Sequence, residues 1–510
     1  MAYDLPAARS SFNPATLRPL YPRQAMAIAE IKQAMRKGHK RIILQAPTGF
    51  GKTLTAAHMI GGALQRGRRP VFVCPTLAVL DKTIDDFEGE GISDIGVIQA
   101  QHERTDCDAK VQIASVKTLV NRKLKDVGFF IRDEAHIGCA QLDEILDYSY
   151  PDTVEIGLSA TPWRRGMGLR WTKLIVAATT RELIDEGSLC SYRGYGPGLD
   201  PDLRGVRTTA GDYNEGDLSR VMQRRELVAD VVQTWLQRAE GRPTFMFAVD
   251  RAHAVALQEQ FQKASVSCGY IDGYSKPDDR KKTFRRFRVG TDKIISSVGC
   301  LVAGVDEDVR CIIMARPTKS EILWVQMIGR GLRTAPGKDF LLILDHAGNA
   351  EKLGFPDAIH HEHLDTREPG EKGGINPRET EPALKPRKCQ SCGFLMPPSA
   401  KICLQCGAER PRRYSGVLTA DGELVEFGIR AKTAPVTARQ RIAGMPPREV
   451  YQELLWACKN GGEAAHRFKD IFGQWPNYPL ALPKLATDAV KGWVKHERLR
   501  WIHSKKRGAA

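Results

Sequence analysis

The chain has 510 residues, of which 42% are hydrophobic and 27% are charged, and its formal net charge is +16. This length predicts about three or four domains of ordinary globular composition. There is no run of about 18 apolar residues and no apolar core between Met1 and Pro14. We therefore expect no membrane span, no secretory signal and a cytoplasmic protein. Most of the 12 cysteines stand singly in apolar stretches, which indicates free thiols in a reducing compartment.

The positive charge is concentrated in two segments. Residues 385–413 and residues 491–507 each carry seven Lys or Arg and one acid. Such clusters indicate a polyanionic partner, although charge alone leaves DNA, RNA and anionic lipid open. Trp493 and Trp501 lie within the second cluster, where they could stack on bases. We interpret both clusters as contacts with a phosphate backbone.

The segment 41–53 predicts a buried strand, a glycine-containing loop and the start of a helix. The two glycines let several backbone N–H groups point at one centre, Lys52 supplies a cation, and the Thr53 hydroxyl can hold Mg²⁺. The sequence therefore predicts a nucleotide-binding loop made of Ala46, Pro47, Thr48, Gly49, Phe50, Gly51, Lys52 and Thr53. Just upstream, the Gln24 amide is a candidate to pair with the adenine edge.

Strands alternate with helical patterns through the first 190 residues. Short apolar runs bounded by polar turns predict buried strands. These runs cover 41–44, 70–74, 111–114, 128–131 and 154–158. The alternation predicts a parallel sheet with helices on both faces, whose ligands bind at the carboxyl ends of the strands.

Two polar motifs follow the ends of predicted strands. Asp133 and Glu134 come directly after the strand 128–131. Asp133 can hold Mg²⁺, and Glu134 can activate the water that attacks the γ-phosphate. Ser159 and Thr161 close the strand 154–158, a short signal that gains meaning only beside the other motifs.

A second α/β domain follows a connection at 191–217. Strands are predicted at 244–248, 269–271, 293–297, 311–315 and 340–344, with a helix at 322–332. This domain has no phosphate loop, but it carries Gln326, Arg330 and Arg333, and the two arginines at i and i+3 share one face of the predicted helix. We predict one ATP between the two domains, with both guanidiniums stabilising charge on the transferred phosphoryl group.

The order of these motifs resembles that of the superfamily 2 helicases of the DEAD/DEAH type. The matching stretches are Gln24, 46–53, Asp133-Glu134-Ala135-His136, Ser159-Ala160-Thr161, Gly304-Val305-Asp306 and 326–333. The stretches 315–318, 328–338 and 344–349 are similar to the RadD-type bacterial DNA repair helicases and their phage relatives. The resemblance covers about residues 15–350. It implies an α/β fold of two tandem RecA-like domains that hydrolyse ATP and move on nucleic acid.

The resemblance also implies roles for single residues. Those that would act on ATP and its Mg²⁺ are Gln24 (adenine), Lys52, Thr53, Asp133, Glu134 (the catalytic base), Asp306 (ribose), Gln326, Arg330 and Arg333. Those that would couple hydrolysis to domain movement are His136, Ser159 and Thr161. Those that would hold the nucleic-acid backbone are Thr76 and Ser115.

Two positions depart from the pattern of that family. Arg132 stands where an apolar residue is usual, and an arginine in a strand buried on both faces is costly unless it is paired. Ala303 replaces the hydroxyl usually found before Gly304, which puts one link between nucleic acid and the ATP site in doubt.

A four-cysteine motif follows the two α/β domains. Residues 351–388 hold five prolines and four glycines and predict a linker, in which His360, His361 and His363 are expected to be solvated. Two C-x₂-C pairs then supply Cys389, Cys392, Cys403 and Cys406. Four thiolates at this spacing predict a closed, structural Zn²⁺ site.

The remaining residues predict a basic, mostly helical domain. Its expected core anchors are Trp456, Phe468, Phe472, Trp475 and Trp493. The predicted domains are therefore a first RecA-like domain (1–190), a second (191–350), a linker (351–388), a zinc ribbon (389–410) and the helical region (411–510).

These features predict an ATP-dependent DNA helicase or translocase acting in repair, recombination or replication, with ATP, Mg²⁺ and Zn²⁺ as cofactors. Single-stranded or branched DNA is the expected partner, and no membrane is. An RNA helicase with the same ATPase remains open, because the motor motifs do not separate the two polymers. A third reading is a zinc-dependent DNA-binding scaffold with an ATP switch.

Overall fold

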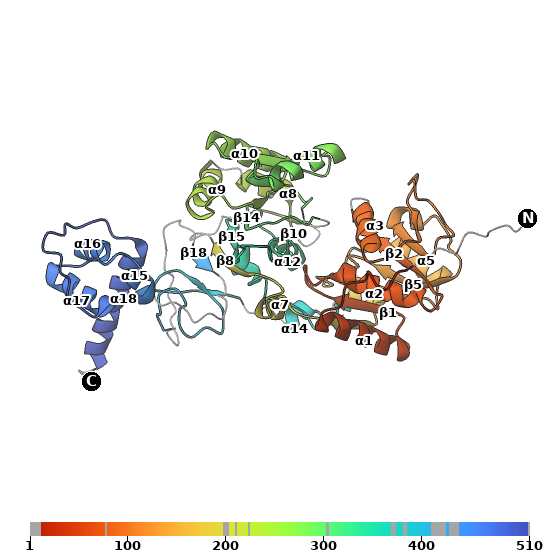
Figure 1. Ribbon diagram of the computed structural model, residues 1–510, viewed down its shortest axis with the longest axis horizontal. Helices are drawn as coiled ribbons and strands as arrows, with labels where there is room; N and C mark the ends of the chain where they lie inside the picture. The colour runs from red at the N-terminus through yellow and green to blue at the C-terminus, as the bar shows by residue number, and fades with distance from the viewer. Residues whose placement is uncertain are drawn as a thin grey trace, which may run out of the picture. The chain divides into compact units, whose positions relative to one another are not determined.

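The computed structural model describes residues 12–76, 79–196, 203, 205–209, 212–222, 225–301, 305–368, 374–380, 385–409, 425–427 and 438–507. The chain forms two compact units (Figure 1). The first contains residues 1–192 and 200–384, and the second contains residues 193–199 and 385–510. The first unit holds two sheets, which define its first and second lobes.

The first lobe is built on a parallel sheet in the order β3-β4-β2-β5-β6-β1-β7. Its strands are β1 (Arg41–Gln45), β2 (Arg69–Cys74), β3 (Ile95–Ile98), β4 (Val111–Ser115), β5 (Val127–Arg132), β6 (Val154–Ser159) and β7 (Lys173–Val176). Ile42, Ile43 and Leu44 of β1 have no exposed surface, as expected for a sheet covered on both faces. The five predicted strands are confirmed, and the edge strands β3 and β7 were not predicted.

Helices connect these parallel strands. They are α1 (Pro22–Arg36), α2 (Lys52–Leu64), α3 (Leu80–Gly89), α4 (Val116–Leu119), α5 (Ala140–Ser149), α6 (Met167–Arg170) and α7 (Thr180–Asp185). Because every strand in the lobe runs in one direction, the ends of β1, β2, β4, β5 and β6 lie at the same edge of the sheet. That edge carries the motifs identified in the sequence.

The second lobe has a parallel sheet in the order β12-β13-β11-β14-β15. Its elements are α8 (Glu215–Met222), α9 (Arg225–Arg238), β11 (Thr244–Phe247), α10 (Arg251–Lys263), β12 (Cys268–Ile271), α11 (Pro277–Arg288), β13 (Ile294–Ser297), β14 (Cys311–Met314), α12 (Glu321–Gly329) and β15 (Phe340–Asp345). A short hairpin pairs β9 (Thr208–Thr209) with β10 (Asp212–Tyr213). Helices α10 and α11 both contact β12 and β13 and lie side by side in Figure 1.

The helix α12 ends earlier than predicted. Its last residue is Gly329, and Arg330 is the residue that caps its C-terminus. Arg333 lies beyond the helix, where it forms an isolated bridge with Leu189. The expectation that Arg330 and Arg333 share a helix face is therefore wrong, because the chain leaves the helix at Gly331.

The first part of the segment predicted as a linker is packed. It includes α13 (Asn349–Leu353), and a later helix, α14, spans Pro377–Thr380. Phe355, Ile359 and Leu364 are 2%, 2% and 8% exposed. Leu364 belongs to a core cluster with Met167 and Trp171 of the first lobe, and the Gly168 N–H donates to Asp365 O at 2.8 Å. Residues 355–368 thus return to the first lobe, a contact that composition does not reveal.

The second unit contains short strands and a helical bundle. Strand β16 (Arg387–Lys388) pairs antiparallel with β17 (Leu395–Met396), and β18 (Val425–Phe427) pairs antiparallel with β8 (Ser191–Gly196). The helices are α15 (Ala438–Ala443), α16 (Pro447–Ala457), α17 (Gly461–Phe472) and α18 (Asp488–Arg507). They enclose their own core, which includes Ile442, Leu454, Phe468 and Val490. This confirms the predicted helical character for residues 438–507.

Among the helices in the described ranges, none combines the length and apolar character that a membrane crossing needs.

Candidate functional site

The predicted nucleotide-binding loop joins β1 to α2. Gly49 and Gly51 have φ angles of 92° and 87°, in the left-handed region that glycine adopts readily. A Cβ at Gly51 would also lie 2.5 Å from Gln24 Nε2, so a larger residue would collide there. The Lys52 ammonium donates to the carbonyl oxygens of Ala46 and Pro47 at 3.0 and 3.4 Å. The loop therefore has the backbone form that presents N–H groups to a phosphate.

Gln24 supports this loop from α1. Its Nε2 donates to Phe50 O at 2.8 Å, and its Oε1 accepts from the Tyr21 N–H at 2.9 Å. The side chain is 1% exposed. The structure thus brings Gln24 to the nucleotide-binding loop, with both ends of its amide bonded to backbone groups. Its role in reading adenine stays a prediction.

Asp133 and Glu134 lie at the end of β5, beside the loop. The Asp133 N–H donates to Val73 O at 3.0 Å, and Glu134 has a φ of 45°, which makes a tight turn. Burial, followed by the charge of Glu134, raises the pKa of Asp133 to about 6, although Lys52 opposes the shift. Ionising this buried carboxylate is costly without a nearby positive charge. A bound divalent cation would supply that charge and favour the ionised form.

Some buried polar atoms of the site lack hydrogen-bond partners within the described part of the protein. Among the described residues, Arg330 Nε is buried without a hydrogen-bond partner, and Glu134 Oε2 is buried with only His136 Nδ1 nearby, at 3.3 Å. Desolvation also lowers the pKa of Lys52, even though Glu134 and Asp133 partly offset it. Phosphate oxygens, Mg²⁺ and an attacking water would satisfy these groups. The residues therefore fit ATP with Mg²⁺. ATP would supply the phosphoryl group, and Mg²⁺ would shield its charge.

Arg132, which the sequence left unexplained, belongs to a buried network of charges. Its Nη1 lies 2.6 Å from Asp143 Oδ1 and 3.6 Å from Glu155 Oε1. Its Nη2 donates to Ile137 O at 2.9 Å. Arg132 is 3% exposed and Glu155 is fully buried. The guanidinium is thus paired, as a buried arginine must be, and it fastens the far end of the turn that carries Asp133 and Glu134.

Other arginines complete the neutralisation of this network. Arg170 Nη2 lies 2.6 Å from Glu155 Oε2, and Arg41 Nη2 lies 2.8 Å from Asp147 Oδ1. The whole network consists of Arg41, Arg132, Arg170, Asp143, Asp147 and Glu155. Three cations therefore face three carboxylates beneath the acidic motif, so the network carries no net charge.

The predicted coupling residues form one chain of hydrogen bonds that crosses between the lobes. His136 Nδ1 lies 2.9 Å from Ser159 Oγ, which also accepts from the Thr161 N–H at 3.1 Å. From the second lobe, Gln326 Nε2 donates to Thr161 Oγ1 at 2.9 Å and lies 3.1 Å from His136 Nε2. With Nε2 accepting from Gln326, the Nδ1 atom of His136 carries the proton.

Burial favours this neutral form of His136. Desolvation lowers the pKa of the imidazole and outweighs the opposing charge of Glu134. Gln326 is 8% exposed, and its amide is hydrogen-bonded to residues of the first lobe. A movement of one lobe against the other would therefore break hydrogen bonds at the residues beside Glu134, the predicted catalytic base.

The second lobe approaches the nucleotide-binding loop at Gly329 and at Arg333, one of the two predicted finger arginines. A Cβ at Gly49 would lie 3.8 Å from Arg333 Cγ, and a Cβ at Gly329 would lie 3.1 Å from Thr48 Cβ. Arg330 and Arg333 both donate to Val305 O, at 3.4 and 3.0 Å. The two guanidinium groups are brought together by this shared carbonyl oxygen, and not by a common helix face.

The charges of the two lobes act on each other. Burial and then the like charge of Arg333 lower the pKa of Arg330 to about 10, against the attraction of Glu134 and Asp133. Arg330 and Arg333 also contribute to the lowered pKa of Lys52. Several cations therefore face one small region, which suits a triphosphate.

Asp306 forms an ionic link between the lobes. It pairs with Arg333, and its Oδ2 lies 3.3 Å from the Lys82 ammonium of α3. Although burial opposes it, attraction by Arg333 and Lys82 lowers the pKa of Asp306. Contact of Asp306 with a ribose stays a prediction.

The two predicted contacts with nucleic acid differ in their surroundings. Thr76 follows β2 and is exposed, whereas Ser115 ends β4 and is 4% exposed. The Ser115 hydroxyl donates to Thr118 Oγ1 at 3.0 Å. Both residues lie after the carboxyl ends of first-lobe strands, and contact with a phosphate backbone stays a prediction for each.

Some residues that contact the site were not predicted from the sequence. Arg164 Nε donates to His136 O at 3.1 Å, and Trp163 Nε1 donates to Gln45 Oε1 at 3.1 Å. Both follow the Ser159–Thr161 motif directly, and that position was the available signal. His361, expected in solvent, is 1% exposed and stacks edge-on against Trp163 at 5.1 Å. Its position depends on long-range packing that no local pattern encodes.

The four predicted metal ligands come together in the second unit. The Sγ atoms of Cys389 and Cys406 lie 3.7 Å apart, those of Cys392 and Cys403 lie 3.6 Å apart, and all four lie within 4.8 Å of one another. A tetrahedron with Zn–S bonds of about 2.3 Å has sulfur atoms about 3.8 Å apart. The cluster therefore fits Zn²⁺.

The two halves of the cluster have the same backbone. Gly393 N–H donates to Cys389 O, and Gly407 N–H donates to Cys403 O, both at 2.8 Å. Both glycines have positive φ angles, 73° and 70°. The four sulfurs leave no open position for a substrate, so a metal here would be structural.

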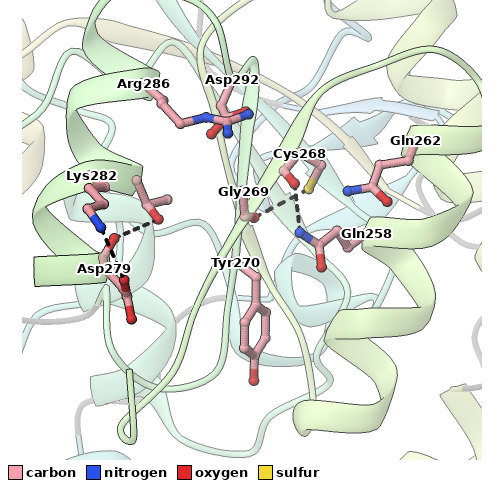
Figure 2. A pocket seen from close by; sticks show the side chains of 10 residues that line it. Gln258, Gln262, Cys268, Gly269, Tyr270, Asp279, Lys282, Arg286 and Asp292 are labelled. Atoms are coloured by element: carbon pink, nitrogen blue, oxygen red, sulfur yellow. Dashed lines mark hydrogen bonds and ion pairs between the residues drawn. The ribbon is translucent and has the colours of Figure 1, made fainter. Parts of the chain in front are cut away.

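A separate cavity of about 420 Å³ lies on the second lobe (Figure 2). It is bordered by α10, β12 and α11, and its polar lining includes Lys282, Arg286 and Asp292. Gln258 donates to Cys268 O at 2.7 Å across its wall. None of the motif residues lines this cavity, so it is distinct from the candidate ATP site.

Comparisons with known proteins agree with this architecture. Residues 18–164 match the family model described as "Type III restriction enzyme, res subunit", and residues 224–335 match the "Helicase conserved C-terminal domain". These two matches fall on the first and second lobes. They cover the predicted nucleotide-binding loop, the acidic motif, Arg330 and Arg333.

Three curated relatives are similar over most of the chain. The putative ATP-dependent helicase IRC3 of Saccharomyces cerevisiae is 30% identical over 66% of this chain and 52% of its own length. The 51.5 kDa protein of a Lactococcus phage is 27% identical over 75% of this chain and 82% of its own length. The type I restriction enzyme EcoAI endonuclease subunit of Escherichia coli is 26% identical over 63% of this chain and 45% of its own length.

The chain thus spans about half the length of the yeast relative. In this chain the matched segments hold the two RecA-like lobes, with the predicted nucleotide-binding loop and acidic motif on one and Arg330 and Arg333 on the other. The chain therefore belongs to superfamily 2 of the helicases.

Proposed function

We propose that this protein is a DNA-dependent ATPase that moves along or unwinds DNA in repair, recombination or replication. One observation carries the proposal. Gln326 of the second lobe bonds to both Thr161 and His136 of the first, at the residues beside Glu134. Hydrolysis at Glu134 is therefore linked to the position of the lobes, which is what a motor on a polymer requires.

The proposed mechanism uses residues of both lobes. The 46–53 loop would hold the phosphates, Asp133 would hold Mg²⁺, and Glu134 would take a proton from the attacking water. Arg330 and Arg333 stabilise the charge on the transferred phosphoryl group. After hydrolysis these attractions weaken, and the lobes separate at the Gln326 contacts. Repeated closing and opening would move the protein along the strand.

DNA is the favoured polymer. Two of the curated relatives are subunits of restriction endonucleases, and the proposed similarity to RadD-type repair helicases points to the same polymer. The zinc cluster, which would stabilise the fold around 389–406, lies in a segment rich in Lys and Arg. We propose that this segment contributes to binding the DNA backbone.

The test is the rate of ATP hydrolysis with single-stranded, duplex and forked DNA and with RNA, at equal salt. DNA is expected to stimulate hydrolysis, and Lys52→Ala and Glu134→Gln are expected to abolish the stimulated rate. Glu144→Gln is the matched control, because this acid of α5 is exposed. A larger stimulation by RNA would assign the motor to RNA. Absence of stimulation by every polymer would refute the proposal.

A further inference from the structure

The tryptophans of the helical bundle differ in their burial. Trp493, expected both as a core anchor and as a ring that could stack on bases, is 6% exposed and belongs to the core of the bundle, so the core prediction is confirmed and its ring is not available for stacking. Trp456 and Trp475, expected in the core, are 47% and 51% exposed. A single exposed ring is not unusual by itself, so what matters is which groups surround each of the two rings.

Trp456 lies in a hollow with a basic border. The hollow has a volume of about 300 Å³ and is lined by Trp456, Ala457, Lys491, Val494, Lys495 and Arg498. The three basic residues follow one another at i, i+4 and i+7, so they lie on one face of α18. The Lys491 ammonium lies 5.1 Å from the centre of the Trp456 ring. The hollow thus combines an indole ring with cations at its border.

The cations of this hollow differ in their availability. Arg498 is neutralised by Glu463, at 2.9 Å, and also donates to Ala457 O at 3.2 Å, so it serves to fix α18. Lys491 has a distant partner in the exposed Asp488, at 3.8 Å. No acid among the described residues pairs with Lys495. Two ammonium groups therefore remain able to bind an anion beside the indole.

We propose that Trp456, Lys491 and Lys495 form a second binding site for single-stranded nucleic acid, outside the motor lobes. A base stacks on the indole, and the adjoining phosphates bind the two lysines. A duplex does not present base faces in this way, so the site selects a single strand. The proposal rests on the proposed function in one respect, because the ligand is the polymer on which the motor acts.

A binding site on the bundle would help a motor to stay attached to its polymer. When the lobes open after hydrolysis, their hold on the polymer weakens, whereas a stacking contact on the bundle does not depend on nucleotide. The bundle would then keep the strand bound between steps. The same chemistry accepts DNA and RNA, since every base has a stacking face.

The experiment measures binding of the nucleotide-free full-length protein to a labelled oligothymidylate by fluorescence anisotropy. Trp456→Ala is expected to weaken binding about 5- to 150-fold, the range for loss of one stacked base. Trp456→Phe retains an aromatic face and is expected to recover most of the affinity. Trp475→Ala is the matched control, because this exposed ring lies in the same bundle outside the hollow; it should change affinity less than about twofold, well below the stacking range.

Salt dependence tests the lysines separately. Replacing Lys491 and Lys495 together by Gln is expected to reduce the slope of log K against log salt by about 1.4, since each phosphate contact with a single strand contributes about 0.7. An unchanged slope would overturn their assignment. Oligouridylate in the same assay shows whether DNA or RNA is held more tightly.

Two results would overturn the site as a whole. One is unchanged affinity for single strands in Trp456→Ala, which would leave the hollow to a protein partner. The other is an equal loss of affinity for blunt duplex, which would mean that Trp456 only supports the fold. Failure of the proposed function shows differently, as an ATPase that no polymer stimulates although Trp456→Ala still weakens binding. With the motor intact, ATP turnover of Trp456→Ala at saturating DNA is expected to match that of the unaltered protein.

Discussion

Replacement of Arg132 by methionine tests why a charged residue precedes the acidic motif. Met has a similar length and is apolar, so the change removes the charge with little change in volume. It leaves Asp143 without its 2.6 Å partner, removes the 3.6 Å contact with Glu155, and frees Ile137 O. Removing one partner of a buried pair costs about 3–5 kcal/mol.

This cost is partly limited by the remaining network. Glu155 keeps Arg170 at 2.6 Å, and Asp143 is 25% exposed at its side chain, so water can replace part of the lost interaction. We therefore expect a loss of about 3 kcal/mol, near the lower end of that range. The matched control is Arg104→Met, because its partner Glu88 lies at 2.5 Å on the surface, with side chains 41% and 39% exposed. Exposed pairs contribute about 0–1 kcal/mol.

Hydrogen exchange of the amides in β5 and β6 measures the stability of this part of the first lobe. Arg132→Met is expected to lower their protection by the equivalent of about 3 kcal/mol, and Arg104→Met by less than about 1 kcal/mol. Equal effects of the two substitutions would refute the inference that the network stabilises the turn.

Three further predictions concern the ATP site, the contact between lobes and the zinc cluster. Asp133→Asn should stabilise the nucleotide-free protein above pH 6 by about 1–3 kcal/mol, since burial raises the pKa of Asp133 to about 6 and ionisation then costs the folded state. The gain should shrink as the pH falls from about 6 toward the ordinary Asp pKa of about 3.9, because the folded-state carboxyl is then protonated and the unfolded-state carboxyl is increasingly protonated too; thermal unfolding at pH 8 and pH 4 checks this, and a gain independent of pH would contradict it. Gln326→Leu should lower DNA-stimulated kcat about 5- to 150-fold through two lost hydrogen bonds, and a change in KM for ATP alone would contradict the link between lobes. Cys392→Ser should remove bound zinc and expose residues 385–409 to protease, whereas Cys107→Ser, an exposed thiol outside the cluster, should retain the metal; zinc retained by Cys392→Ser would exclude the four-sulfur site.

The central strands of both lobes could be predicted because they are local patterns. Runs such as 41–45 and 311–314 are buried on both faces, and a continuous apolar run records that burial directly. The edge strands β3 and β7 were missed because neither is a continuous buried apolar run: β3 contains a glycine (IGVI), and β7 begins with the exposed Lys173. The zinc ligands were predictable for the same local reason, since their spacing lies within 18 residues.

Other features depend on contacts between distant residues. The partners of Arg132 lie on α5 and β6, and the partner of Leu364 lies nearly 200 residues earlier. The exposure of Trp456 was mispredicted because an aromatic residue at helical spacing usually faces a core. Which face of α16 is covered depends on where α17 and α18 pack, and the local sequence does not determine that.

The central claim is that both lobes act on one ATP. Its most direct test compares Arg330→Ala with Arg310→Ala, a second-lobe arginine that pairs with Asp308 and donates to Pro336 O and Gly337 O, outside residues 326–333. Single-turnover ATP hydrolysis and the affinity for a non-hydrolysable ATP analogue are measured for each protein with saturating DNA. The account predicts that Arg330→Ala slows hydrolysis about 10³-fold or more, as expected for an arginine finger, while its affinity for the analogue changes much less and Arg310→Ala behaves as the unaltered protein. Hydrolysis by Arg330→Ala at the unaltered rate would contradict it.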